Sequence, residues 1–219
     1  MIRVLVADDE AMIRAGVRAI LDTDPDVEVV AEAADGDEGV ALAREHLPDV
    51  ALVDIRMPVV DGIAGTERIM AAADDAGHEP PRVLVLTTFD LDEGAARAIR
   101  AGASGFVLKD AEPEFLLAAI RTVHAGTAVL APSATRELFE HFGGRGAAGS
   151  AEQHLGTLSE REREIFLLAA RGLSNAEIAS AEYVSEATVK THISRILGKL
   201  GLRDRVQLVV FAHERRLVS

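Results

Sequence analysis

Five short runs of apolar, mostly β-branched residues recur between residues 2 and 108, separated by stretches with the helical period. They cover residues 2–7, 27–31, 50–53, 83–86 and 106–108. Each run is nearly continuous rather than alternating, which is typical of strands buried on both faces. The pattern predicts an open α/β domain over residues 1–125, in which helices cover both faces of a five-stranded parallel sheet.

The composition changes after residue 125. Residues 133–141 have the pattern of a short helix, and residues 143–150 are rich in glycine and small side chains, so residues 126–156 are expected to form a helix and a flexible linker. Beyond them we predict an all-α domain over residues 157–219. Its four helices each begin with a capping residue: Ser159, Ser174, Ser185 and Asp204.

The charge is distributed unevenly between these regions. The net charge of −13, taken over the whole chain, argues against nucleic-acid binding. However, residues 155–219 carry ten Lys and Arg and eight Asp and Glu. Residues 1–154 carry 13 Lys and Arg and 28 Asp and Glu. The net charge of the C-terminal domain is therefore compatible with DNA binding.

The chain contains no cysteine, which excludes disulfides and thiolate chemistry. It has no run of about eighteen apolar residues, and its N-terminus enters a strand directly. Neither a membrane span nor a signal peptide is predicted, so we expect a cytoplasmic protein without a membrane partner.

Polar side chains lie at the ends of four predicted strands. Asp8 and Asp9 follow the first run, Asp54 the third, Thr87 the fourth and Lys109 the fifth. The carboxyl ends of parallel strands meet at one edge, where ligands bind in open α/β sheets. Three carboxylates at one edge repel each other unless they share a cation, and such a set of oxygen ligands suits Mg²⁺. The sequence therefore predicts a magnesium site.

Asp54 is the candidate nucleophile at this site. A carboxylate beside Mg²⁺, with the Lys109 ammonium and the Thr87 hydroxyl to hold other phosphoryl oxygens, can attack phosphorus and form an aspartyl phosphate. None of the seven histidines falls on this edge, so the phosphoryl donor must come from outside the chain.

Four segments, VLVADDE, VALVDIRMPVVDG, VLVLTTFD and GASGFVLKD, resemble the motifs of response-regulator receivers, which have a flavodoxin-like (CheY-like) fold. The resemblance implies that Asp9, Asp54 and the backbone carbonyl of Arg56 coordinate Mg²⁺, with Asp8 acting closely or through water. It also implies that a partner histidine kinase, or a small acyl phosphate, supplies the phosphoryl group.

The same resemblance assigns roles to three further residues. Thr87 is expected to move towards the phosphoryl group on Asp54, which lets the Phe106 ring swing inward. Lys109 is expected to pair with the phosphoryl charge. Thr87 and Phe106 are thus the predicted switch residues.

Residues 184–200 predict an amphipathic helix. Its apolar face is formed by Val189, Ile193, Ile196, Leu197 and Leu200. The rest of its surface is small, polar and basic, as a helix in the major groove requires. The candidate DNA contacts are Thr188, Lys190, Thr191, His192, Ser194, Arg195 and Lys199.

Residues 157–217 resemble the LuxR-type helix-turn-helix of the NarL/FixJ branch of regulators. By this resemblance Lys190, Thr191 and Ser194 face the bases, and the other four candidates contact phosphates. Glu182 departs from the pattern, because the family usually has an apolar residue there, so the turn before the recognition helix is expected to pack less tightly.

The last predicted helix, residues 205–215, is apolar nearly all round. A domain of this size cannot easily cover so much apolar surface, which suggests a homodimer contact. Its candidate residues are Val206, Val209 and Val210.

Together these features predict a transcriptional regulator of a two-component system, activated through Asp54 phosphorylation and dimerisation. Promoter DNA is the expected partner, RNA polymerase is a further candidate, and the only expected catalysis is of the chain's own phosphorylation and dephosphorylation. One alternative is a Mg²⁺-dependent phosphotransferase or phosphatase, although the residue two after Asp54 is Arg56 and not an acid. Another is a regulator of the same fold controlled by a partner or ligand without phosphorylation.

Overall fold

The computed structural model describes residues 1–87, 93–126, 155–215 and 217–218. The contacts divide the chain into two compact units, Met1–Ala131 and Pro132–Ser219. The helix predicted within residues 133–141 and the glycine-rich linker at 143–150 lie outside the described residues.

The first unit is built on a five-stranded parallel sheet with the order β2-β1-β3-β4-β5. Its strands are β1 (Ile2–Ala7), β2 (Val27–Ala33), β3 (Val50–Asp54), β4 (Arg82–Thr87) and β5 (Ala103–Leu108). The predicted α/β fold is confirmed. β5 begins three residues earlier than expected, because Ala103, Ser104 and Gly105 have little strand propensity and become a strand only by pairing with β4.

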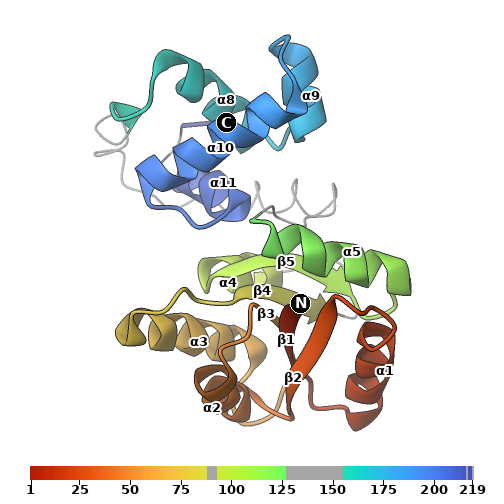
Figure 1. Cartoon of the computed structure of the whole chain (residues 1–219). Coiled ribbons are helices and arrows are strands. Elements are labelled where there is room, and N and C mark those ends of the chain that lie inside the picture. The colour runs from red at the N-terminus through yellow and green to blue at the C-terminus, as the bar shows by residue number, and fades with distance from the viewer. Residues whose placement is uncertain (88–92, 127–154, 216, 219) are drawn as a thin grey trace. The chain divides into compact units, whose positions relative to one another are not determined.

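Helices cover both faces of the sheet (Figure 1). They are α1 (Ala11–Leu21), α2 (Gly36–His46), α3 (Gly62–Ala76), α4 (Glu93–Arg100) and α5 (Pro113–His124). α1 and α5 pack on one face and α2, α3 and α4 on the other. The core is formed by buried residues such as Val4, Leu52, Leu84 and Ile120. The polar residues at the strand ends therefore lie at the edge of a packed apolar core.

The described part of the second unit is all helical, as predicted. It contains α8 (Glu160–Ala170), α9 (Asn175–Ala181), α10 (Glu186–Leu200) and α11 (Arg205–Glu214). Ser159 and Ser174 each form a capping box with the glutamate three residues later. The core centres on Phe166, whose ring meets that of Phe211 edge to face at a centroid distance of 6.2 Å. None of the helices in the described ranges has the length and hydrophobicity to cross a bilayer.

Candidate functional site

The predicted acidic residues lie together at the carboxyl edge of the sheet. Asp8 directly follows β1, and Asp54 is the last residue of the neighbouring strand β3. The chain passes from β1 outward to β2 and then returns to β3, so these two strands flank the point where the strand order reverses. Open α/β sheets bind their ligands at this point.

Lys109 joins the two buried carboxylates. Asp8 is fully buried and Asp54 is only 4% exposed. The Lys109 ammonium lies 2.7 Å from Asp8 Oδ2 and 2.9 Å from Asp54 Oδ2. One cation thus faces two carboxylates, and their charges are only partly balanced within the site.

Burial and the neighbouring charges shift the pKa values of these groups. Burial raises the pKa of Asp54, and this effect outweighs the hydrogen bond with Lys109, which acts in the opposite direction. The nearby charge of Asp8 raises the same pKa further. Burial lowers the pKa of Lys109, but the hydrogen bonds with Asp8 and Asp54, together with the charges of these carboxylates, outweigh burial and raise it. Lys109 therefore keeps its proton at neutral pH, and Asp54 is harder to ionise than an exposed aspartate.

The donor atoms fit a hard divalent cation. One carboxylate oxygen each from Asp8, Asp9 and Asp54 can be chosen so that all three lie within 4.8 Å of one another. The buried Asp8 Oδ2 lies against the Lys109 ammonium at 2.7 Å. Asp9 is exposed, which leaves the site open to solvent and substrate. Oxygen donors, a surplus of negative charge and access for water match the preference of Mg²⁺.

The loop after Asp54 is fixed by close backbone packing. A Cβ on Gly62 would lie 1.8 Å from the carbonyl oxygen of Asp54, and one on Gly36 would lie 2.6 Å from that of Val60. Val59 has a left-handed backbone, with φ of 65°, although its side chain is 85% exposed. The sequence analysis did not predict this approach of Gly62 to Asp54, because the contact depends on how α3 packs against β3.

The other predicted residues of this edge occupy positions compatible with their roles. The Thr87 carbonyl accepts a hydrogen bond of 2.8 Å from the backbone N–H of Lys109, which ties the ends of β4 and β5 together. The Phe106 ring is buried, with 6% exposure. A backbone hydrogen bond from Arg56 helps to lower the pKa of Asp54 against the effect of burial. Movement of Thr87 and Phe106, and ligation by the Arg56 carbonyl, stay predictions.

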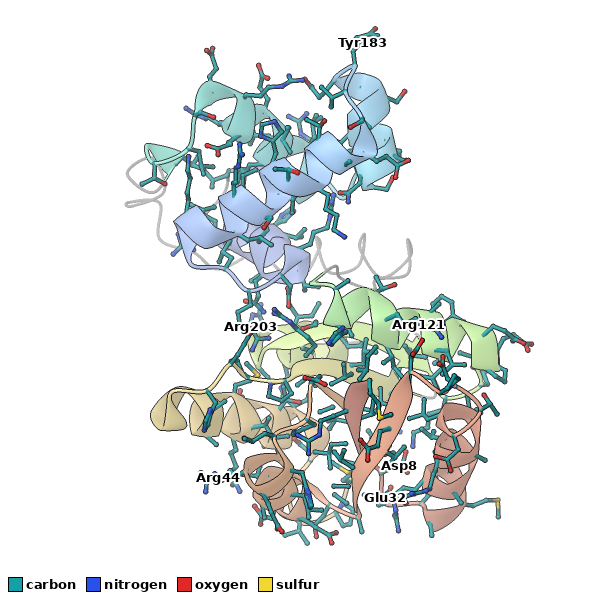
Figure 2. All side chains as sticks on the ribbon, in the orientation of Figure 1. Asp8, Glu32, Arg44, Arg121, Tyr183 and Arg203 are labelled. Atoms are coloured by element: carbon teal, nitrogen blue, oxygen red, sulfur yellow. The ribbon has the colours of Figure 1, made fainter. Side chains whose placement is uncertain are left out.

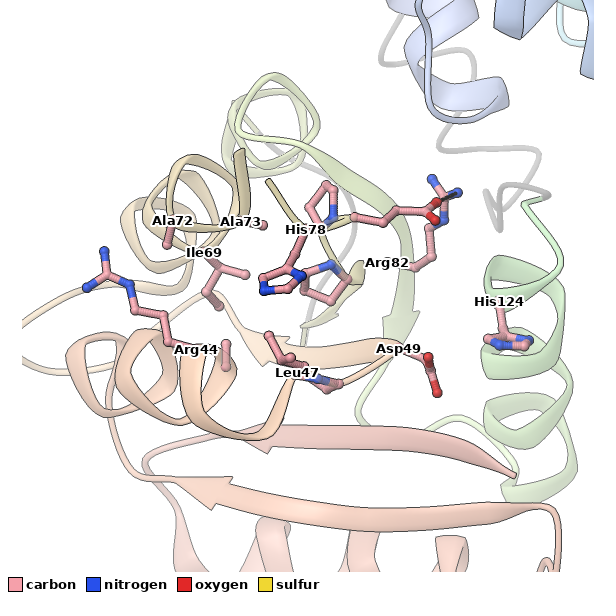
Figure 3. A pocket seen from close by; sticks show the side chains of 14 residues that line it. Arg44, Leu47, Asp49, Ile69, Ala72, Ala73, His78, Arg82 and His124 are labelled. Carbon is pink, nitrogen blue, oxygen red and sulfur yellow. Dashed lines mark hydrogen bonds and ion pairs between the residues drawn. The ribbon is translucent and has the colours of Figure 1, made fainter. Parts of the chain in front are cut away.

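A second hollow lies at the opposite edge of the same sheet (Figure 3). This pocket of about 400 Å³ is lined by residues that include Leu47, Asp49, His78 and Arg82. Residues 78–81, just before β4, contribute one wall. None of the predicted site residues lines this pocket, so it is separate from the chemistry at Asp54.

The predicted DNA-reading face of α10 is largely exposed. Ser185 caps the helix by accepting a hydrogen bond from the backbone N–H of Thr188 at 3.1 Å. The exposed side chains include those of Thr188, Lys190, Thr191, Ser194, Arg195 and Lys199. His192 is only half-exposed, and its Nδ1 is buried without a hydrogen-bond partner.

Lys199 has a partner within its own domain. Its ammonium lies 2.6 Å from Glu162 Oε2, and this glutamate also closes the capping box at Ser159. The hydrogen bond with Lys199, followed by that from the Ser159 backbone, lowers the pKa of Glu162 to about 2. Lys199 therefore links α10 to α8, whereas its predicted phosphate contact stays a prediction.

The turn before α10 is held by a residue that the sequence analysis did not select. Arg161 forms an ion pair with the Glu182 carboxylate and donates a hydrogen bond of 2.9 Å to the Glu182 carbonyl. An ion pair thus replaces the apolar contact that is usual at this position. An acidic residue at that position is the signal that could have prompted a search for a basic partner.

The apolar surface expected on the last helix is not exposed. Val206, Val209 and Val210 are 1%, 5% and 7% exposed. The described core of the second unit takes Leu208, Phe211 and Ala212 from this helix but none of the three valines. A dimer contact through the valines stays a prediction.

Comparison with known proteins supports both units. Residues 4–121 match the family described as "Response regulator receiver domain", and residues 156–212 match "Bacterial regulatory proteins, luxR family". The transcriptional regulatory protein LiaR of Bacillus subtilis (strain 168) is 40% identical over 219 residues, all of this chain and of that protein.

Two further relatives share the full length. The response regulator protein VraR of Staphylococcus aureus (strain NCTC 8325 / PS 47) is 37% identical over 218 residues, which span 100% of this chain and 99% of VraR. The crystal structure of the response regulator ChrA, from a heme-sensing two-component system, is 39% identical with a TM-score of 0.52. It covers 99% of this chain and 98% of ChrA.

Proposed function

Because the chain belongs to the two-component response regulators that join a receiver to a LuxR-type DNA-binding domain, we propose that phosphorylation of Asp54 controls its binding to promoter DNA. The observation that carries the proposal is the buried pair Asp8 and Asp54, bridged by Lys109, with Asp9 close by. A cytoplasmic location and a partner histidine kinase are parts of the same proposal.

In the proposed reaction, a carboxylate oxygen of Asp54 attacks the phosphorus of the donor. The P–N bond of a phosphohistidine, or the P–O bond of an acyl phosphate, breaks as the new P–O bond forms. Asp9, Asp54 and the Arg56 carbonyl, together with Asp8, would hold Mg²⁺, which would supply positive charge to offset that of the phosphoryl oxygens. Lys109 is already charged and buried, so it pairs with a phosphoryl oxygen without reorganisation of solvent.

The phosphoryl group then shifts the receiver between two conformations. The Thr87 hydroxyl follows the new negative charge, and the space that it leaves accommodates the Phe106 ring. A preference of roughly 3 to 5 kcal/mol for the active conformation moves most of the population. The resulting surface favours a homodimer, which presents two α10 helices to two half-sites on DNA.

The DNA contacts follow the exposed face of α10. Lys190, Thr191 and Ser194 are proposed to read base edges, and Thr188, His192, Arg195 and Lys199 to contact phosphates. RNA polymerase is a candidate partner once the dimer is bound. On this proposal the chain acts on its own aspartate and turns over no external substrate as an enzyme.

The proposal is tested by light scattering after size-exclusion chromatography. Wild type and Asp54→Asn are compared with Mg²⁺, with and without beryllofluoride, which mimics a phosphoryl group. Asp26→Asn is the matched control, since Asp26 is exposed and lies just before β2, at the opposite edge of the sheet from Asp54.

We expect wild type and Asp26→Asn to become dimers with beryllofluoride, while Asp54→Asn stays monomeric, and we expect DNA affinity to rise in parallel. The proposal fails if all three proteins behave alike. Control by a partner or ligand without phosphorylation then becomes the better explanation. Turnover of phosphorylated small molecules by the wild type would instead favour a phosphotransferase.

A further inference from the structure

The turn between α9 and α10 contains a residue that the fold itself does not favour. Tyr183 has a left-handed backbone, with φ of 55°. The next residue, Val184, donates its backbone N–H to the Ala179 carbonyl at 3.0 Å. This hydrogen bond is typical of a helix C-terminus at which the left-handed residue, here Tyr183, is usually a glycine. The other left-handed residues in the described part of this domain are glycines, Gly172 and Gly201.

Packing does not explain a tyrosine here either. The Tyr183 side chain is 96% exposed, and Figure 2 shows it pointing away from the helices. Among the described residues it has no hydrogen-bond or ring partner. A left-handed backbone is unfavourable for a residue with a Cβ, and strained residues concentrate where they contact a ligand or partner. The side chain is thus available for a contact outside the domain.

Arg161 holds the peptide group that precedes Tyr183. Its guanidinium donates to the Glu182 carbonyl at 2.9 Å and also pairs with the Glu182 carboxylate. A further ion pair of 2.8 Å with Glu164 anchors the same guanidinium on α8. These contacts fix the direction of the Glu182–Tyr183 peptide. They also offset the charge of Glu182, which would otherwise repel a phosphate group.

We propose that Tyr183 contacts the sugar–phosphate backbone of DNA at the edge of the groove that α10 enters, and that Arg161 and Glu182 are its positioning residues. This inference rests on the proposed DNA-binding function. Tyr183 lies two residues before Ser185, the N-cap of α10. The first residues of a recognition helix reach the base edges, so the turn just before it lies near the phosphates.

The chemistry of tyrosine suits that position. Its phenolic O–H donates a hydrogen bond to a phosphate oxygen, and its ring packs against a deoxyribose. Such a contact sets the register of α10 in the groove without reading a base. It also adds affinity without adding positive charge to a domain that is nearly neutral.

The test measures DNA binding by the full chain, with Mg²⁺ and beryllofluoride present, by fluorescence anisotropy on a labelled duplex of mixed sequence over a series of salt concentrations. Tyr183→Phe removes only the hydroxyl, and we expect Kd to rise about tenfold. The slope of log Kd against log salt should not change, because a neutral hydroxyl releases no counterion. Lys190→Ala is the control, and we expect it to reduce that slope by about one.

Tyr183→Gly separates binding from folding. Glycine relieves the left-handed backbone, so we expect this variant to unfold at a higher temperature while binding DNA at least as weakly as Tyr183→Phe. If the residue acts only in folding, the more stable variant should bind as well as wild type.

The positioning role is tested by a double-mutant cycle. Arg161→Met should weaken binding, Arg161→Lys should restore part of it, and Tyr183→Phe should have little further effect in the Arg161→Met background. Independent, additive effects of the two substitutions would overturn the positioning role.

The remaining outcomes separate this inference from the function on which it rests. If Lys190→Ala weakens binding while Tyr183→Phe and Tyr183→Gly match wild type, the inference about Tyr183 is wrong and the proposed function stands. If the wild-type chain binds no duplex, the proposed function fails and the inference falls with it.

Discussion

The ammonium of Lys109 lies between the carboxylates of Asp8 and Asp54, 2.7 Å from one and 2.9 Å from the other. Removal of this cation leaves two buried carboxylates without compensation. We expect Lys109→Met to lower the free energy of unfolding at pH 7 by about 3 to 5 kcal/mol. Urea unfolding should show that the loss shrinks in acid, where the carboxylates are protonated, and that Mg²⁺ recovers part of it. The control is the Asp54→Asn/Lys109→Met double variant, in which one of the two carboxylates is also removed. Its free energy of unfolding should fall by less than that of Lys109→Met.

Asp54→Asn should have the opposite effect on stability. The pKa of Asp54 is raised in the folded chain, chiefly by burial, so the folded state binds this proton more tightly than the unfolded state. The stabilisation that the folded state gains by binding this proton is fully present below pH 3.8, the ordinary pKa of aspartate. It is lost as the pH rises through the pKa of Asp54 in the folded chain. At neutral pH without Mg²⁺, Asp54→Asn should therefore unfold at a higher temperature than wild type, with the difference vanishing below pH 3.8. An equal or lower midpoint at pH 7 would contradict this.

Gly62→Ala should displace the loop that follows Asp54. The added methyl group would lie 1.8 Å from the Asp54 carbonyl oxygen, so the backbone must move. We expect a loss of about 2 to 4 kcal/mol in thermal or urea unfolding, with slower phosphorylation by acetyl phosphate. Gly16→Ala is the control, because nothing lies within 4 Å of a Cβ at this helical position. It should stabilise the chain by about 0.5 to 1 kcal/mol.

The ion pair between Glu162 and Lys199 predicts acid sensitivity of the C-terminal domain. The folded pKa of Glu162 is about 2, below its ordinary value of 4.5, mainly because of the hydrogen bond with Lys199. The stability from this pair is present above pH 4.5 and is lost as pH falls towards about 2. NMR titration of the Glu162 carboxyl carbon should show a midpoint that rises in Lys199→Met. A midpoint near 4.5 in wild type would refute the pairing.

Lys190 and Lys199 should differ in their response to salt on DNA. Both are exposed on α10, but within the described ranges only Lys199 has a carboxylate partner. We expect Lys190→Ala to reduce the slope of log Kd against log salt by about one, and Lys199→Ala to reduce it by clearly less. Fluorescence anisotropy at several salt concentrations measures both slopes. Equal slopes for the two variants would mean that Lys199 leaves Glu162 when DNA binds.

The sequence by itself predicted the sheet, the helices of the second domain and the edge at which Asp8, Asp54 and Lys109 meet. These features follow from local rules. Strand and helix periodicity act over a few residues, and a cap such as Ser159 contacts the helix that it begins. Because the strands are parallel, their polar ends must share an edge wherever the sheet forms.

The tertiary structure decided the contacts between distant segments. Lys109 bridges two carboxylates from different strands, and Lys199 reaches Glu162 across 37 positions in the chain. Gly62 fits closely against the Asp54 carbonyl. These outcomes depend on how closely packed elements approach one another, to within fractions of an ångström. Residue types and spacing do not specify that separation, because it is fixed only when the whole core packs.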